Sequence, residues 1–367
     1  MTEAHSILAP SAAFRWVKCP GSAKLSALFP EDEHGEAAAE GTAAHYAASY
    51  FLANGHWPMS LAAPNGVAIT EEMKVNLQPY LDSVEPARHF PDGVKLEERI
   101  VATSVHPDVW GTADAYALHA PSKTVYLWDL KYGHGIVEAW ENWQLVAYAS
   151  ALLDLVTPEW TFVLRIVQPR AFHRDGVVRT WSLTAAELRT YARDLHTAAH
   201  EAMGNNPQVV VGAYCKFCPA RHACLAAQSS ALEAEQQSFQ AVPLVLSPAG
   251  LSLELSLLRR AQERLTARLT GLEAQALSEI RAGKVVPGWT IEHTNGREEW
   301  TKPTADVLAL GALFGVSLGK PPEPITPRQA RDAGVSADII AAYSQRKTGT
   351  AKLTPVSTSK ARQAFGG

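Results

Sequence analysis

Apolar positions along the chain first recur with the 3.6-residue period of a helix and then with the two-residue period of a strand. The helical period covers residues 36–52 and 71–84, and a shorter helix is expected after Ser11, its N-cap, with Pro20 and Gly21 ending it. Alternation rich in β-branched residues then predicts three successive strands. These strands are expected over residues 98–104, 110–118 and 124–131.

The next stretch repeats this change of period. Residues 138–155 have helical spacing, whereas residues 161–168 and 177–182 are typical of strands. Thr184 and Glu187, three residues apart, form a capping box that opens a further helix. This order of elements predicts the α/β class, with a mixed sheet flanked by helices.

The composition changes after about residue 230, so we expect a first domain over residues 1–230 and a mainly helical extension over residues 231–367. Ser247 and Pro248 are typical of the start of a long amphipathic helix. That helix could pack on the first domain, dimerise or contact a nucleic acid. A hairpin near residues 289–301 and short helices over residues 304–314, 327–333 and 336–344 are expected beyond it.

Charge and hydropathy narrow the class of protein. The net charge of −4 argues against a polycation that coats nucleic acid. No apolar stretch reaches the roughly 20 residues that cross a bilayer, and no signal segment opens the chain, so we expect a cytoplasmic protein without a membrane partner. The tail is basic, and it could contact phosphates or form a solvated terminus. Its basic residues are Arg346, Lys347, Lys352, Lys360 and Arg362.

Candidate catalytic residues lie on two of the expected strands. Asp114 lies within one of them, and Asp129 and Lys131 end the next, two residues apart and therefore on one face. Two carboxylates and a backbone carbonyl, that of Leu130, are oxygen ligands that Mg²⁺ prefers. Lys131 would then orient the attacking water or help to deprotonate it, and offset charge on a phosphate. An isolated Asp-X-Lys is more often a surface ion pair.

Neighbouring residues extend this set. Gln144 and Tyr148 are four residues apart and share a helix face. His45 would be either a metal ligand or a satisfied buried histidine. Glu98 could be a further metal carboxylate or a surface charge. His106, in a loop, is a weaker candidate for the metal site, and Asn142 is expected to be structural.

Four cysteines stand in a one-plus-three arrangement: Cys19 near the N-terminus, then Cys215, Cys218 and Cys224. Thiolates in this pattern favour a four-iron cluster or zinc, while buried inert thiols stay an alternative. Disulfides are not expected in the cytoplasm. A metal centre would join the two ends of the first domain and close a very long loop.

Taken together, residues 10–227 resemble the PD-(D/E)XK nuclease superfamily, and within it the RecB-like branch with an iron–sulfur cluster. The resemblance implies a restriction-endonuclease-like fold closed by a four-cysteine [4Fe–4S] centre, and a Mg²⁺- or Mn²⁺-dependent DNA exonuclease in phage or bacterial recombination. It implies linear DNA ends as substrate, with a single-strand annealing protein as a partner, and an oligomer is possible. The residues that carry it are His45, Asp114, Asp129, Lys131, Gln144 and Tyr148, with the four cysteines.

Two rival hypotheses remain from the sequence. One is a DNA-binding or assembly factor that keeps the nuclease fold without turnover, and the other is a zinc-stapled protein unrelated to nucleases. Four tryptophans around the expected site could stack on unpaired bases or pack in the core. They are Trp128, Trp140, Trp143 and Trp160.

Overall fold

The computed structural model describes residues 6–29, 36–237 and 245–291, together with residues 309, 336 and 338. The chain divides into two compact units, Met1–Ile291 and Glu292–Gly367. The predicted hairpin beyond residue 291, the three short C-terminal helices and the basic tail lie outside the described residues, apart from those three single positions. Residues 289–291, where the hairpin was expected to begin, form no strand. The domain boundary expected at residue 230 falls within helix α7 of the first unit.

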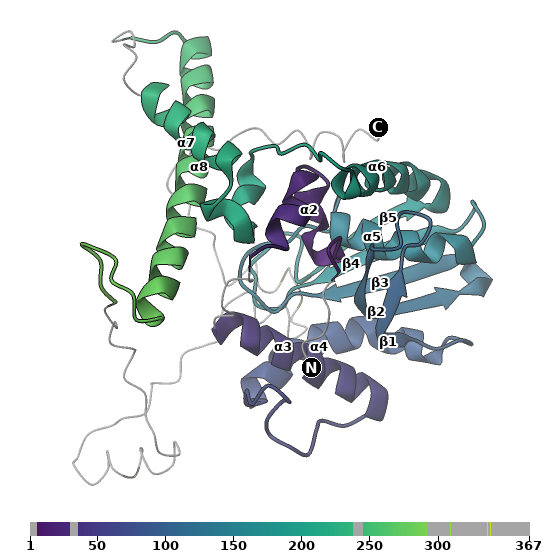
Figure 1. Cartoon of the computed structure of the whole chain (residues 1–367). Helices are drawn as coiled ribbons and strands as arrows, with labels where there is room; N and C mark the ends of the chain where they lie inside the picture. The colour runs from purple at the N-terminus through teal and green to yellow at the C-terminus, as the bar shows by residue number, and fades with distance from the viewer. Residues whose placement is uncertain are drawn as a thin grey trace. The chain divides into compact units, whose positions relative to one another are not determined.

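Five strands of the described chain form one mixed sheet in the order β1-β2-β3-β4-β5 (Figure 1). Strands β1, β2 and β3 pair antiparallel, β3 and β4 pair parallel, and β5 is antiparallel to β4. The parallel pair needs a crossover connection, which helix α5 provides. The strands are β1 (Lys95–Val101), β2 (Trp110–His119), β3 (Thr124–Leu130), β4 (Thr161–Val167) and β5 (Val178–Thr184).

Helices surround this sheet and continue beyond it (Figure 1). The α-helices are α1 (Ala13–Trp16), α2 (Gly21–Ser26), α3 (Glu36–Asn54), α4 (Glu71–Val84), α5 (Trp143–Leu152), α6 (Ala185–Met203), α7 (Leu225–Gln237) and α8 (Pro248–Arg281). Short 3₁₀ helices are η1 (Pro10–Ala12), η2 (Glu85–His89), η3 (Ala120–Ser122), η4 (Leu153–Leu155), η5 (Ala213–Phe217) and η6 (Pro219–His222).

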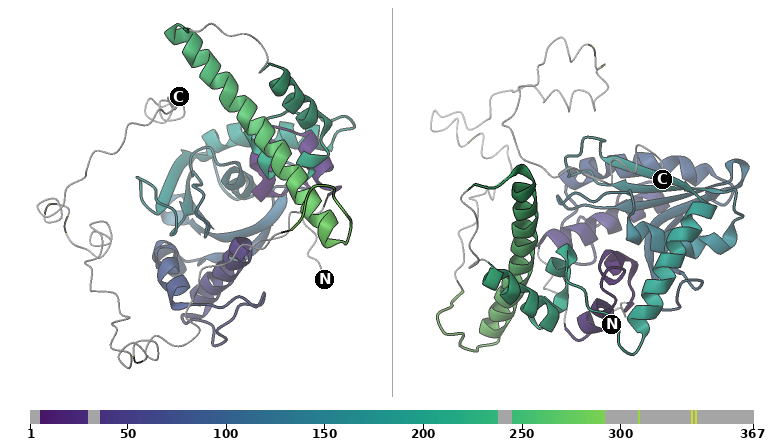
Figure 2. Two further views of the ribbon diagram at one scale, coloured as in Figure 1. Left: turned by 90° about the vertical axis from the view of Figure 1, so that its left-hand side faces the viewer. Right: turned by 90° about the horizontal axis from the view of Figure 1, so that it is seen from above.

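The alternation of side chains along β3 divides the core in two. Val125 and Leu127 join the cluster that α5 and α6 complete, whereas Trp128 and Leu130 join the cluster of α3 and α4. Both faces of the sheet are therefore buried, which explains why β3 is apolar at nearly every position. Figure 2 shows these helices on opposite sides of the sheet. The prediction of a mixed α/β fold flanked by helices is confirmed.

Capping residues set several helix ends where the sequence predicts them. Thr184 and Glu187 form the expected capping box of α6. The Ser247 side chain accepts a hydrogen bond from the backbone N–H of Gly250 at the start of α8. Helix α4 spans the predicted residues, with Thr70 as its N-cap. Local hydrogen bonding thus fixes these boundaries.

Other boundaries differ from the predictions. Ser11 is not an N-cap but lies inside η1. Gly21 begins a second helix instead of ending the first, with Pro20 as its N-cap, where the missing N–H costs no helical hydrogen bond. Strand β1 begins three residues earlier than expected. Helix α5 begins only at Trp143, after Asn142. Helix α7 was not predicted, and no helix among the described residues is long and apolar enough to cross a membrane.

Candidate active site and thiol pocket

The candidate site begins where strands β2 and β3 separate. Their backbone ladder ends at the pair Ala115 and Trp128. Beyond it, the backbone N–H of Leu130 donates to Asp114 Oδ2 at 2.6 Å. A carboxylate thus replaces the missing strand partner, and this contact fixes the direction of the Asp114 side chain.

His45 from α3 is brought to this fork. Its Nδ1 lies 3.2 Å from Asp114 Oδ1, and its side chain is 31% exposed. Burial alone would lower the pKa of His45, but the Asp114 carboxylate outweighs burial and raises the pKa to about 9. An ion pair therefore forms here in the protein without a metal.

The third group at the fork is Glu97 and not Glu98. One ligand atom each of His45, Glu97 and Asp114 lies within 4.8 Å of the others. Glu98 instead accepts a hydrogen bond of 2.7 Å from the Tyr116 hydroxyl. Strand alternation sends the two neighbouring glutamates to opposite faces, and only the register of β1 against β2 shows which one meets Asp114.

Asp129, Lys131 and Gln144 form a second group on the α5 side of the sheet. Asp129 Oδ2 lies 2.8 Å from Lys131 Nζ, and the Asp129 side chain is only 3% exposed. Lys131 Nζ also donates to Gln144 Oε1 at 2.9 Å. The predicted residues of β3 and α5 therefore converge on one ammonium group.

Helix α5 presents Gln144 and Tyr148 through its capped first turn. The Asn142 side chain accepts hydrogen bonds from the backbone N–H groups of Gln144 and Leu145, so Asn142 is structural, as predicted. Tyr148 is buried beneath Gly111, where an added Cβ would lie 3.2 Å from the tyrosine hydroxyl. Glycine at this position therefore leaves room for the tyrosine.

The surroundings shift the pKa values of the two aspartates in opposite directions. Burial raises the pKa of Asp114, but the cations of His45 and Lys131 and the Leu130 amide outweigh it, and the net direction is downward. Burial also raises the pKa of Asp129, and the Asp114 carboxylate adds to that effect against the ammonium of Lys131. The carboxylates of Asp114 and Asp129 repel each other, and a bound cation would allow both to keep their charge.

The donor set fits a divalent cation. His45 supplies an imidazole nitrogen, Glu97 and Asp114 supply carboxylate oxygens, and the three groups are close enough to share one ion. The carbonyl of Leu130 stays a predicted ligand. It faces β2 together with the Leu130 N–H, because both groups of an extended residue point to the same side.

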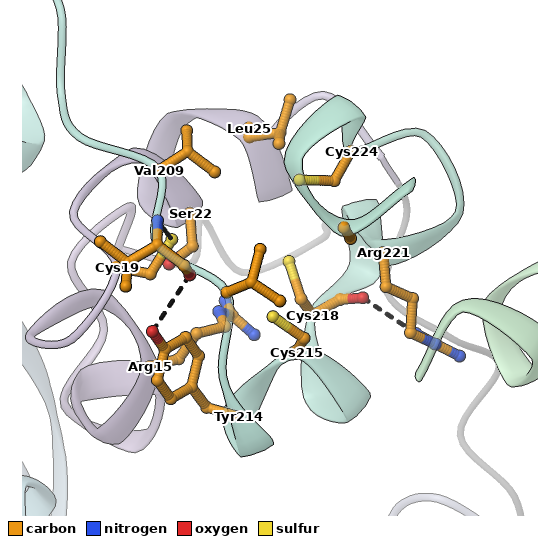
Figure 3. Close-up of a pocket in the computed structure, with 13 residues that line it drawn as sticks. Arg15, Cys19, Ser22, Leu25, Val209, Tyr214, Cys215, Cys218, Arg221 and Cys224 are labelled. Carbon is orange, nitrogen blue, oxygen red and sulfur yellow. Dashed lines mark hydrogen bonds between the residues drawn. The ribbon is translucent and has the colours of Figure 1, made fainter. Parts of the chain in front are cut away.

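All four cysteines line a single pocket, together with Tyr214 (Figure 3). Cys19 and Cys218 are buried, and Cys215 and Cys224 are partly buried. The backbone N–H of Val210 donates to Cys19 Sγ at 3.3 Å. Burial raises the pKa of the Cys19 and Cys215 thiols. The fold thus gathers thiols from segments about 200 residues apart.

The spacing of the thiols and an adjacent cation bear on what they could bind. Among the described residues no three of the four Sγ atoms lie within 4.8 Å of one another, whereas tetrahedral zinc would hold thiolates about 3.8 Å apart. Arg15 lines the same pocket, and its buried Nε has no hydrogen-bond partner among the described residues. Four thiolates are ligands for a four-iron cluster or for zinc, and a nearby guanidinium would offset the negative charge of either centre.

Remaining candidates lie outside both sites. His106 Nδ1 accepts a hydrogen bond from the backbone N–H of Asp108, and its ring meets the His200 ring edge to face. Trp128 is buried in the core beside α4 and donates to Ser83. The other three predicted tryptophans are partly buried and pack against the larger core cluster. Core packing therefore accounts for the tryptophans: Trp128, Trp140, Trp143 and Trp160.

The fold and these two sites define an α/β protein with a candidate carboxylate–histidine metal site and a four-cysteine pocket. A family model described as "Protein of unknown function (DUF2800)" matches residues 5–313. The chain belongs to the DUF2800 family.

Proposed function

We propose that this protein is a metal-dependent DNA nuclease that hydrolyses phosphodiester bonds at linear DNA ends. The observation that carries the proposal is the convergence of Asp114, Asp129 and Lys131 with His45 and Glu97 at the fork between β2 and β3. An ion-pair network with only a structural role has no need of five ionisable groups whose charges interact where β2 and β3 separate.

Lys131 has the role that its surroundings allow. Burial would lower the pKa of Lys131, but the carboxylates of Asp129 and Asp114 outweigh burial and raise it. The ammonium therefore stays protonated near neutral pH. We assign Lys131 to orienting the attacking water and stabilising charge on the phosphate, and not to accepting a proton.

The metal would be Mg²⁺ or Mn²⁺, held by His45, Glu97, Asp114, Asp129 and the Leu130 carbonyl, and it would supply Lewis-acid activation of water and phosphate. Gln144 keeps the Lys131 ammonium in place through its Oε1. Tyr148 limits the space beside Gly111. We propose that both side chains position the DNA strand.

We further propose that the four cysteines hold a [4Fe–4S] cluster with a structural role, with zinc as the alternative. The wide spacing of the thiols supports the cluster over zinc. The finer assignment, a RecB-like PD-(D/E)XK exonuclease of bacterial or phage recombination that works with an annealing protein, rests on the sequence motifs. Such a thiol centre fits the cytoplasm, where thiols stay reduced.

The test is a time course on end-labelled linear single- and double-stranded DNA with anaerobically purified protein, in Mg²⁺, Mn²⁺ or EDTA. Wild type is expected to shorten DNA only with metal. Lys131→Ala and Asp129→Asn are expected to lower the rate by about 100-fold or more, because each removes a charge from the reacting centre.

A matched control lies at the other end of the same strand. Lys123 directly precedes β3 and forms a surface ion pair with Glu159. Its φ of 50° suits asparagine, so Lys123→Asn is expected to keep the wild-type rate. Equal rates in wild type and Lys131→Ala would overturn the site. DNA binding without cleavage by metal-loaded wild type would instead favour the non-catalytic DNA-binding factor.

A further inference from the structure

Helix α8 uses one side to pack on its own chain. Ala267 and Gly271 are buried, and an added Cβ on Gly271 would lie 2.7 Å from Arg221 Cγ. Arg268 donates to the backbone carbonyl of His222 on the same side. Small residues allow this close approach to η6, and α8 also contacts η5 and α7. This side of α8 is therefore occupied.

Another side of α8 presents leucines to solvent at heptad spacing. Leucines recur every seven residues from Leu251, each followed four residues later by a second apolar position or Gln262. In heptad terms the first set occupies d and the second occupies a, whereas Ala267 and Gly271 fall at f and c, away from that seam. The exposed seam leucines are Leu251 (49%), Leu255 (40%), Leu258 (55%), Leu265 (43%), Leu269 (54%) and Leu272 (41%).

Charges beside this seam are complementary in a parallel pair of α8 helices. In a parallel coiled coil a g residue contacts the e residue five positions later on the other helix. Glu254 at g would meet Arg259 of the second copy. This contact joins opposite charges, and symmetry forms it twice.

The only polar residue at a seam position between Leu251 and Leu272 also favours the parallel arrangement. Gln262 at a would face the Gln262 of a second copy, amide to amide, which fixes register. An antiparallel pair that overlaps over all of residues 251–276 would instead place Gln262 against Leu265. That arrangement leaves a buried amide unpaired.

We propose that α8 pairs with α8 of a second copy of this chain as a parallel two-stranded coiled coil over residues 251–276. The seam spans between three and four heptads, the length at which such a pattern becomes specific. Six half-exposed leucines on each copy would be buried, and that burial supplies the attraction.

The first test is the mass of the full-length protein in solution by light scattering after gel filtration. Wild type is expected at twice the 39.7 kDa mass of the chain. Leu258→Glu with Leu265→Glu is expected at the single-chain mass, because charges in the seam oppose pairing. Leu253→Glu changes an equally exposed leucine at an f position and is expected to leave the dimer intact.

The second test fixes the orientation. Glu254→Arg is expected to weaken the dimer at least tenfold, and adding Arg259→Glu is expected to restore it. Failure of Arg259→Glu to restore the dimer would overturn the proposed parallel arrangement. Wild type at the single-chain mass at all concentrations, as when another segment of the same chain covers the leucines, would overturn the dimer. No DNA is involved, so the outcome is independent of the proposed nuclease activity.

Discussion

Glu97 departs from ordinary strand geometry at the residue scale. Its φ is 47°, in the left-handed region, although it lies within β1. A non-glycine residue in that region costs about 1 to 3 kcal/mol, and such strain is often found at functional sites. Here the unusual backbone accompanies a carboxylate that reaches His45 and Asp114. We interpret the strain as the cost of bringing this carboxylate into the proposed metal site.

The protonation of Glu97 and His45 predicts how stability without metal depends on pH. Crowding by protein atoms, together with the Asp114 carboxylate, raises the pKa of Glu97 to about 7 from 4.5, and the pKa of His45 rises from 6.5 to about 9. A raised pKa means that the folded state holds its proton more tightly. Its contribution is complete below the unfolded pKa and is lost as pH rises through the folded value.

In EDTA the Tm of wild type is therefore expected to fall between pH 5 and pH 9, by about 2 to 4 °C for each kcal/mol lost. Glu97→Gln is expected to remove the part of the fall between pH 5 and pH 7, whereas Glu98→Gln follows wild type because Glu98 pairs with Tyr116. Thermal scans at several pH values measure this. Identical profiles for the two variants would contradict the role of Glu97.

At the scale of elements, the first turn of α5 connects helix capping to the site. Asn142 caps the helix, and the next residues carry the acceptor of Lys131 and the tyrosine beneath Gly111. Helix α6 has a cap of the same kind in Thr184 but carries none of the proposed site residues. Variants of the two caps therefore distinguish an effect on stability from an effect on the proposed catalysis.

Asn142→Ala and Thr184→Ala are each expected to lower stability by about 1 kcal/mol, the usual cost of losing a cap. Only Asn142→Ala is expected to lower the cleavage rate as well, by about tenfold or more, because Gln144 then loses its fixed position. Denaturant unfolding measures the stability, and the DNA time course measures the rate. An equal loss of rate in both variants would show that the rate merely follows stability.

What could be predicted from the sequence depended on local signals. Periodicity and capping residues act within a few positions. They predict the strands with Asp114 and Asp129, the α6 capping box and the start of α8. The choice of Glu97 over Glu98 could not be predicted, because the register of β1 on β2 depends on residues distant in sequence. Helix α7 lacks a clear apolar period, since alanine, serine and glutamine fill most of it.

On the scale of the whole molecule, the thiol pocket joins the beginning of the folded unit to a segment after α6. Lys24 donates to the carbonyls of Met203 and Gly204, and Gly21 N–H donates to Gln208 O. These hydrogen bonds run beside Cys19 and the three later cysteines. A metal centre here would close a loop of nearly two hundred residues.

Cys19→Ser is expected to lose bound iron and to lower the Tm by about 5 to 15 °C, since a link across so long a loop stabilises by a few kcal/mol. Leu25→Ala alters the same pocket without removing a thiol and is expected to retain iron. Metal analysis and thermal scans of anaerobically purified proteins provide the readout. Stoichiometric zinc without iron would show that the centre is zinc and not a cluster. The absence of both metals would show that the thiols are inert.

The contacts of α2 have a consequence for synthesis of the chain. Residues 21–24 are made about 180 positions before the backbone groups that they bind, at residues 203, 204 and 208. Until those residues are made, this segment has none of these partners. Residues 21–24 therefore reach their native position only late in synthesis of this domain, and any cluster must be inserted after residue 224 has emerged.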